Sequence, residues 1–98
     1  MTITSVPDPW TILTEEDFEY EETRKEFLHP QTELLVQNTE NGDVLAIEAG
    51  VEHAVRYSVV EFTPIVSPDP HVTEYLHQAD SISEAEEQLQ DEIRDRMD

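Results

Sequence analysis

Asn41 and Gly42 constrain the fold of this chain most strongly, because they lie between two runs rich in aliphatic residues. Asn-Gly favours the two positive φ values that a two-residue type I′ hairpin turn requires. The dipeptide therefore predicts that the segments on either side of it pair as antiparallel strands. Counting outward from a two-residue turn places Val36 opposite Ile47.

The same register sorts the side chains of the hairpin onto two faces of a sheet. One face is mainly apolar, and the other is mixed, which suits partial exposure or cover by a helix. A third run, from Ala54 to Phe62, alternates in a similar way and predicts a further strand. The apolar face holds Leu34, Val36, Asn38, Leu45, Ile47 and Ala49, and the mixed face holds Leu35, Gln37, Thr39, Val44, Ala46 and Glu48.

The stretch before the hairpin carries several signals of a helix. Thr14 is a candidate N-cap, and the acids that follow it suit the positive end of a helix dipole. Leu13 and Phe18 have the spacing of a hydrophobic staple, and His29-Pro30 predicts where the helix ends. The alternative interpretation takes residues 18–28 as an edge strand. The sequence favours the helix but leaves both open.

The last segment predicts an amphipathic helix that begins after Ser81 or Ser83. Its apolar residues recur mostly at every fourth position and form one stripe, and the opposite face is acidic. Residues 72–79, just before it, can be read as a strand or as a helix, and the strand is favoured. The apolar stripe consists of Ile82, Ala85, Leu89, Ile93 and Met97.

Prolines mark the remaining segments. Pro7 and Pro9 predict an extended N-terminal arm over residues 1–12, in which Trp10 either anchors the arm on the core or acts as an exposed recognition residue. Three prolines predict a rigid loop over residues 63–71. The expected fold is therefore one α+β domain over residues 1–98. It has a small antiparallel sheet of three to four strands, a helix before the sheet, and the amphipathic C-terminal helix packed on it.

The charge is extreme for this length. Twenty-four acidic residues against five Lys and Arg give a formal net charge of −19, while a hydrophobic fraction of 37% in strand-like patterns argues against disorder. Scattered carboxylates, a single lysine and no cysteine resemble the composition of haloarchaeal proteins, which work in molar salt. At such salt the Debye length falls to about 3 Å, so carboxylates repel one another much less. The resemblance implies salt adaptation.

Composition also excludes several classes of function. Without cysteine there are no disulfides, thiolate metal sites or cysteine nucleophiles. Without a basic patch, direct binding to nucleic acid or to anionic membranes is disfavoured. The first residues have no signal-peptide pattern, and no apolar run approaches about 18 residues, so we expect a cytoplasmic protein.

No pattern of residues predicts catalysis, a metal site or a cofactor. The four histidines have no zinc-like spacing, and the two glycines provide no phosphate-binding loop. Residues 37–48 match an EF-hand loop only in part, because Gln37 and Thr39 stand where carboxylates are needed. His53, in a predicted loop beside Glu52, is the histidine best placed to titrate near neutral pH.

Three hypotheses on function follow. The first is a non-enzymatic interaction or regulatory module that binds a protein partner, with a possible homodimer through a sheet edge or through the stripe of the last helix. The second is a nucleic-acid mimic that inhibits a DNA- or RNA-binding protein by occupying its basic groove. The third, a small metal-dependent enzyme, has no supporting motif. The candidate interaction surface comprises Glu15, Glu16, Asp17, Glu19, Glu21 and Glu22, together with Trp10 and His53.

Overall fold

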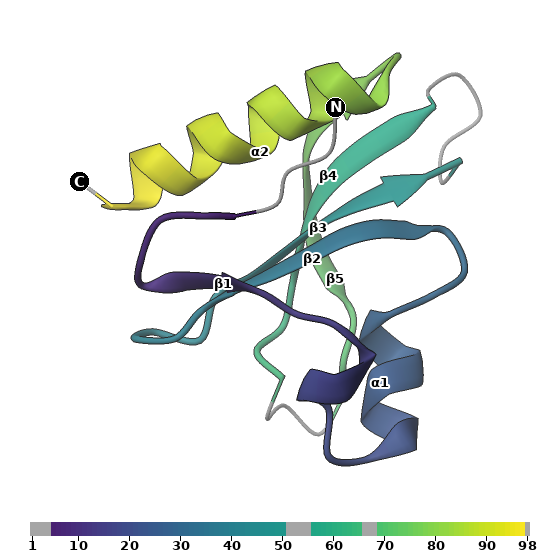
Figure 1. The fold of residues 1–98 in the computed structure, drawn as a ribbon. Coiled ribbons are helices and arrows are strands. Elements are labelled where there is room, and N and C mark those ends of the chain that lie inside the picture. The colour runs from purple at the N-terminus through teal and green to yellow at the C-terminus, as the bar shows by residue number, and fades with distance from the viewer. Residues whose placement is uncertain (1–4, 51–55, 66–68, 98) are drawn as a thin grey trace.

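The computed structural model describes residues 5–50, 56–65 and 69–97. It has an α+β architecture, in which all neighbouring strands of one sheet are antiparallel and lie in the order β1-β2-β3-β4-β5 (Figure 1). The elements are β1 (Trp10–Ile12), the 3₁₀ helix η1 (Glu15–Asp17), α1 (Glu21–Phe27), β2 (Thr32–Asn38), β3 (Val44–Ala49), β4 (Tyr57–Phe62), β5 (Val72–Ala79) and α2 (Ile82–Met97).

The predicted fold class is confirmed, but the predicted strand number is wrong, because the sheet has five strands. The additional strand is β1, in which Trp10 pairs with Asn38 and Ile12 pairs with Val36 of β2. Three residues are too few to show the alternation by which a strand is recognised in a sequence. This strand therefore depends on β2 being in place as a template.

The two helices lie on opposite sides of the sheet (Figure 1). On one side α2 packs on alternate residues of the strands, and on the other side Phe27 of α1 packs on the residues between them. The two faces deduced from the hairpin are the faces observed, since Val36 and Ile47 join the α2 side and Leu35 and Ala46 join the α1 side. The core therefore has two layers with β3 between them.

The register of the β2–β3 hairpin differs from the predicted one. Val36 lies opposite Leu45 and not Ile47, and the loop spans residues 39–42, because the amide of Asn38 donates to the carbonyl of Asp43 at 2.8 Å. Gly42 has a φ of 85°, whereas Asn41 has no positive φ, so the two-residue type I′ turn is wrong.

The side chain of Asn38 accounts for this longer loop. Its Oδ1 accepts hydrogen bonds from the amides of Glu40 at 2.9 Å and Asn41 at 3.3 Å. The amide of Gly42 also donates to the carbonyl of Asn38 at 2.8 Å, so the side chain and the backbone of Asn38 together hold the four-residue loop. The partners of residues 34–37 move by two positions, and because side chains alternate with a period of two, these residues keep their predicted face. A further irregularity between Thr32 and Leu34 shifts the pairing at the start of β2.

The predicted helix between Thr14 and His29 is two shorter helices, η1 and α1, joined through residues 18–20. The carboxylate of Asp17 turns back and accepts from the amide of Thr14 at 2.7 Å and from its hydroxyl at 3.2 Å. Phe18 then turns toward the sheet and stacks on Phe27, with 6.2 Å between the ring centroids. The alternative of an edge strand over residues 18–28 is wrong, and α1 ends before His29-Pro30 as predicted.

The interpretation of residues 72–79 as a strand is confirmed, since β5 pairs with β4 and forms one edge of the sheet. Its pairing is interrupted twice, between Val59 and Val60 and between Glu61 and Phe62 of β4. The strand predicted from Ala54 to Phe62 is β4, which begins at Tyr57; residues 54–55 lie outside the described part of the chain. Of the predicted loop over residues 63–71, residues 66–68 also lie outside the described part.

The predicted C-terminal helix is confirmed as α2. The hydroxyl of Ser81 accepts from the amide of Glu84 at 3.2 Å and so caps its first turn. Leu89 and Ile93 of the apolar stripe are fully buried against the sheet, whereas Met97 is 45% exposed. The centre of the stripe is therefore buried within the chain, and its last residue, Met97, is partly exposed.

Arg96 fastens the last turn of α2 to the sheet. Its Nε donates to Glu92, one helical turn earlier, at 2.9 Å, and its two terminal nitrogens donate to the two carboxylate oxygens of Glu61 at 3.0 and 3.1 Å. Nη1 also donates to Asp43 at 3.1 Å. The hydrogen bonds that Arg96 donates to Glu61 are the main reason why the pKa of Arg96 lies above its usual value. The contacts with Asp43 and Glu61 were not predicted, because they join residues 35 and more positions apart.

Replacement of Leu89 by alanine tests the packing of α2. We expect Leu89→Ala to lower the free energy of unfolding by about 2–5 kcal/mol, since it leaves a cavity against the sheet. Met97→Ala, on the same stripe, is the control and should change stability by no more than about 0.5 kcal/mol. Urea unfolding followed by circular dichroism measures both, and equal losses would contradict this arrangement.

Candidate functional site

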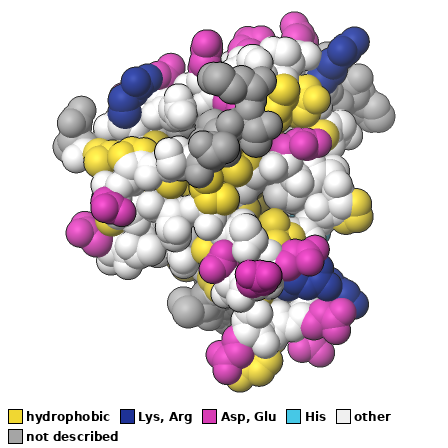
Figure 2. All heavy atoms as spheres, in the orientation of Figure 1, with side chains coloured by type: hydrophobic (Ala, Val, Ile, Leu, Met, Phe, Trp, Pro, Cys, Tyr) yellow, Lys and Arg dark blue, Asp and Glu magenta, His cyan; other side chains and the backbone are white. Residues whose placement is uncertain are grey.

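The acidic segment, residues 15–22, runs from η1 into the first turn of α1. All six acids predicted for the interaction surface lie on it, and the structure places each of them at the surface. Figure 2 shows acidic side chains gathered around the end of the molecule where η1 and α1 lie, with basic side chains beside them. The structure therefore brings Glu15, Glu16, Asp17, Glu19, Glu21 and Glu22 together on one exposed segment.

The six carboxylates are not equivalent. Glu15 lies 3.6 Å from Arg24, and Glu21 lies 3.5 Å from Arg24 and 3.7 Å from Lys25. Asp17 uses one oxygen to cap η1. The other three, Glu16, Glu19 and Glu22, form no ion pair with any residue that the structure describes.

Tyr20 lies in the middle of the acidic segment and is 62% exposed, more than any other large hydrophobic residue described. Beside it is a hollow of about 340 Å³, which we call the Tyr20 hollow. Sequence reasoning missed its apolar residues, although an aromatic residue flanked by Glu19 and Glu21 was a visible signal. The Tyr20 hollow is lined by Asp17, Phe18, Glu19, Tyr20, Thr23 and Ile65.

The two other residues predicted for the surface do not join this segment. Trp10 is 2% exposed and packs in the core on the α2 side of the sheet, where its Nε1 has no hydrogen-bond partner among the described residues. It therefore anchors β1 and cannot serve as an exposed recognition residue. His53 lies outside the described residues.

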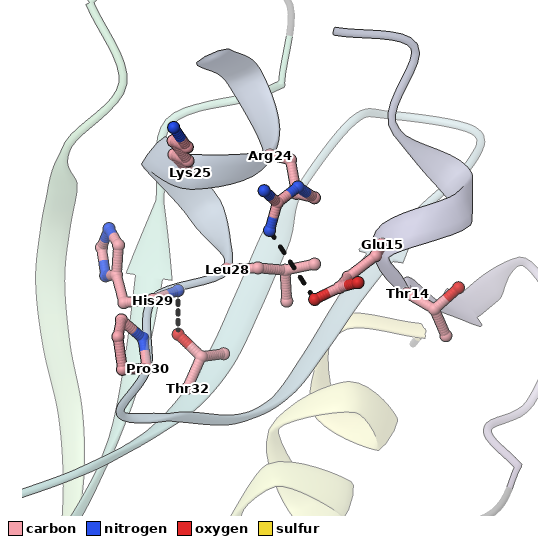
Figure 3. Close-up of a pocket in the computed structure, with 8 residues that line it drawn as sticks. All are labelled: Thr14, Glu15, Arg24, Lys25, Leu28, His29, Pro30 and Thr32. Carbon is pink, nitrogen blue, oxygen red and sulfur yellow. Dashed lines mark hydrogen bonds and ion pairs between the residues drawn. The ribbon is translucent and has the colours of Figure 1, made fainter. Parts of the chain in front are cut away.

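A larger hollow of about 590 Å³, which we call the Arg24 hollow, lies where α1 leads into β2 (Figure 3). Figure 3 shows Arg24 directed toward Glu15, which lies 3.6 Å away, while the amide of His29 donates to the hydroxyl of Thr32 at 3.0 Å. The basic side chains that line the Arg24 hollow are paired with acids, since Glu15 and Glu21 both contact Arg24. The Arg24 hollow is lined by Thr14, Glu15, Arg24, Lys25, Leu28, His29, Pro30 and Thr32.

Glu48 is a buried carboxyl next to this hollow. It is 3% exposed, and its Oε2 lies 3.8 Å from Nδ1 of His29, which is too long for a hydrogen bond. Burial raises the pKa of Glu48, and the neighbouring His29 offsets part of that rise. Ser58, opposite Glu48 on β4, is also buried, and its hydroxyl has no partner among the described residues.

A carboxyl with a raised pKa beside an imidazole is an arrangement that active sites use. Here, however, Glu48 does not line the Arg24 hollow, so a substrate bound there would not reach it. The pair is better explained as a buried contact between β3 and the residues that follow α1. His71 and His77 lie elsewhere, within reach of the carbonyl of Asp69 at 2.8 Å and the carboxylate of Glu92 at 3.4 Å.

Two further properties describe the site's surroundings. Over residues 5–50, 56–65 and 69–97, no group of three or more His, Asp or Glu side chains is arranged to hold a metal ion. None of the helices in this part of the chain has the length and apolar character needed to cross a membrane.

The fold and the site define a small α+β protein with a five-stranded antiparallel sheet and an exposed acidic segment. Comparison with known protein families, curated proteins and solved structures finds no match for this chain. Its function is therefore inferred from its own residues.

Replacement of Glu48 by glutamine tests the burial of this carboxyl. Its pKa is raised in the folded chain, so the stability that it contributes is complete below the pKa of the unfolded chain and is lost as pH rises through the folded pKa. Glu48→Gln cannot ionise, so we expect it to be more stable than the natural chain at pH 7 and to lose that advantage toward pH 4.

Thermal melts between pH 4 and pH 8 measure this difference. Glu33→Gln is the matched control, because Glu33 is exposed on the neighbouring strand β2 and carries the same charge. A Glu48→Gln chain that is less stable than the natural one at every pH would mean that the carboxylate is favourably paired.

Proposed function

We propose that this chain is a non-enzymatic interaction module that binds a protein partner through the acidic segment. Tyr20 carries the proposal, because a large aromatic side chain with 62% of its surface exposed lies in the centre of a charged surface. Tyrosine is one of the residues that contribute most binding energy at protein interfaces, and it does so when polar residues surround it and exclude water. Glu19 and Glu21 flank Tyr20 in this way.

The partner surface that fits this segment is basic. Glu16, Glu19 and Glu22 have no cation beside them among the described residues, so an incoming Lys or Arg does not have to displace an existing pair. In molar salt the Debye length is about 3 Å, so these carboxylates favour a basic partner only through groups that touch them.

The nucleic-acid mimic is the alternative form of this proposal. A mimic needs a row of carboxylates that are free to replace phosphates, but Glu15 and Glu21 are already matched by Arg24 and Lys25. The interruption of the row and the exposed Tyr20 both favour a general protein partner over a phosphate-binding groove. No arrangement of the described residues favours the metal-dependent enzyme.

A homodimer through the apolar stripe of α2 is disfavoured, because Leu89 and Ile93 are fully buried within the chain. The sheet has two edge strands: β1 is only three residues long, and the pairing of β5 with β4 is interrupted at two places. Short or irregular edge strands resist the addition of another strand. We therefore base the proposal on the acidic segment and not on self-association.

Salt adaptation and a cytoplasmic location are part of the same proposal. Acidic residues are exposed on every side of the molecule, including Glu33 on β2, Glu74 on β5 and Glu87 on α2. Repulsion among such charges opposes the compact state in dilute buffer and is screened in molar salt. This distribution suits solubility in a salt-rich cytoplasm, and among the exposed acids only those of the acidic segment around Tyr20 bear on the partner.

Salt dependence of folding tests the adaptation. We expect the melting temperature, followed by far-UV circular dichroism, to rise steadily between about 0.1 M and 3 M KCl as the carboxylates are screened. A triple variant, Glu33→Gln, Glu74→Gln and Glu87→Gln, should show a weaker dependence, because it has fewer charges to screen. Equal slopes for the two chains would contradict the electrostatic explanation.

Binding through Tyr20 tests the interaction module. The immobilised chain is exposed to a halophile lysate in 2 M KCl, and captured proteins are identified by mass spectrometry and titrated. We expect Tyr20→Ala to weaken capture of the specific partner by roughly tenfold or more. Tyr75→Ala is the control, because Tyr75 is also exposed, at 47%, but lies on β5.

The control variant should bind within about twofold of the natural chain. If both tyrosine variants capture the same proteins as the natural chain, the acidic segment is not the binding surface.

A further inference from the structure

We propose that the Tyr20 hollow receives an arginine side chain of the basic partner. This inference rests on the proposed function and gives the chemistry of the contact at its centre. Three properties of the hollow support it: an apolar floor, acids at its rim, and an aromatic ring at its edge. Each of them matches a different part of an arginine side chain.

The floor matches the aliphatic stem of arginine. Phe18 and Ile65 are both half-buried and pack against the core cluster on the α1 side of the sheet. Phe18 is held by its stack on Phe27, at 6.2 Å between centroids and 20° between planes. Because the floor belongs to the core, the hollow exists before a partner arrives and need not be ordered by binding.

The rim matches the positive charge of the guanidinium. Glu19 is exposed and forms no ion pair with a described residue, and Asp17 uses only Oδ2 in its contacts with Thr14, which leaves Oδ1 free of them. Burying an arginine stem while its charged end stays near carboxylates and water avoids the cost of a fully buried charge.

The ring of Tyr20 matches the flat face of the guanidinium. Tyr20 is the N-cap of α1, and its carbonyl accepts from the amide of Arg24 at 3.1 Å, so its backbone is fixed although its side chain is exposed. Guanidinium groups stack on aromatic rings better than lysine ammonium groups do, because they are planar and weakly hydrated. This favours arginine over lysine.

The Tyr20 hollow is the smaller of the two hollows described above. At about 340 Å³, the Tyr20 hollow is at the lower end of the range of about 300–1,000 Å³ that is typical of ligand pockets. The Arg24 hollow is larger, at about 590 Å³, and is lined by Arg24 and Lys25, which Glu15 and Glu21 already match. A cation therefore finds a carboxylate without an ion pair only at the smaller hollow.

Titration with defined peptides tests the inference. The probe is a soluble peptide with three arginines separated by Gly-Ser, and the comparison peptides carry citrulline or lysine in place of arginine. Binding is followed by ¹H–¹⁵N NMR spectra of the whole chain. We expect the arginine peptide to shift the amides of residues 17–23 and Ile65, and citrulline, which has the same shape without the charge, to bind roughly tenfold more weakly. The lysine peptide should also bind more weakly than the arginine peptide.

Matched variants separate a specific contact from attraction to a highly acidic molecule. Glu19→Gln and Tyr20→Ala should each weaken the arginine peptide by roughly two- to fivefold. Glu87→Gln removes the same charge from α2 and should leave the affinity unchanged. Unchanged spectra outside the hollow show that each variant keeps its fold.

The outcomes are distinct. Shifts spread over the whole surface, equal affinities for arginine and lysine, or equal losses in Glu19→Gln and Glu87→Gln overturn the inference. Shifts of the same residues with protein concentration alone would assign the hollow to a second copy of the chain. If a lysate protein binds through Tyr20 but the peptide does not bind, only this inference fails. If the peptide binds but no protein is captured through Tyr20, the proposed function fails.

Discussion

The burial of β3 on both faces is the constraint on which the rest of the structure depends. Residues 44–47 are fully buried, so one helix alone could not remove their side chains from water. An antiparallel strand with two apolar faces needs a cover on each side. The long helix α2 covers one face, and the short helix α1 with the chain before it covers the other. The cover on the α1 side consists of two short helices, η1 and α1, between which the chain changes direction. The acidic segment and the Tyr20 hollow lie along this change of direction.

Much of this architecture is visible in the sequence, because it rests on periodicity. The alternation in the hairpin fixes the two faces, and the four-residue spacing around Leu89 fixes the buried side of α2. The predictions that are wrong are those on features that depend on a single contact. The side chain of Asn38 holds the longer hairpin loop, and Phe18, whose backbone is extended and whose ring stacks on Phe27, ends η1 after one turn, so register and helix length differ from the prediction. Neither contact changes which face a residue occupies.

The candidate site was predictable only as a run of acids. Their exposure follows from their chemistry, but the hollow beside Tyr20 joins residues 17–23 to Ile65, which is more than 40 positions away in the chain. No spacing rule connects such segments. Trp10 is an error of the opposite kind: it was a candidate for the exposed surface, but it is buried because β1 pairs with β2. Sequence reasoning thus located the charged part of the surface and missed its apolar part.

At position 96, the positive charge of the side chain matters more than its size for which residues can replace Arg96. One guanidinium holds Glu92, Glu61 and Asp43, which come from the helix, the strand β4 and the hairpin. Without that cation, three carboxylates would face one another in a partly buried place, where salt screens them less than at the surface. The contact that fastens α2 would become a repulsive one. In a chain with four arginines and one lysine, position 96 should therefore be among the least tolerant of neutral replacement.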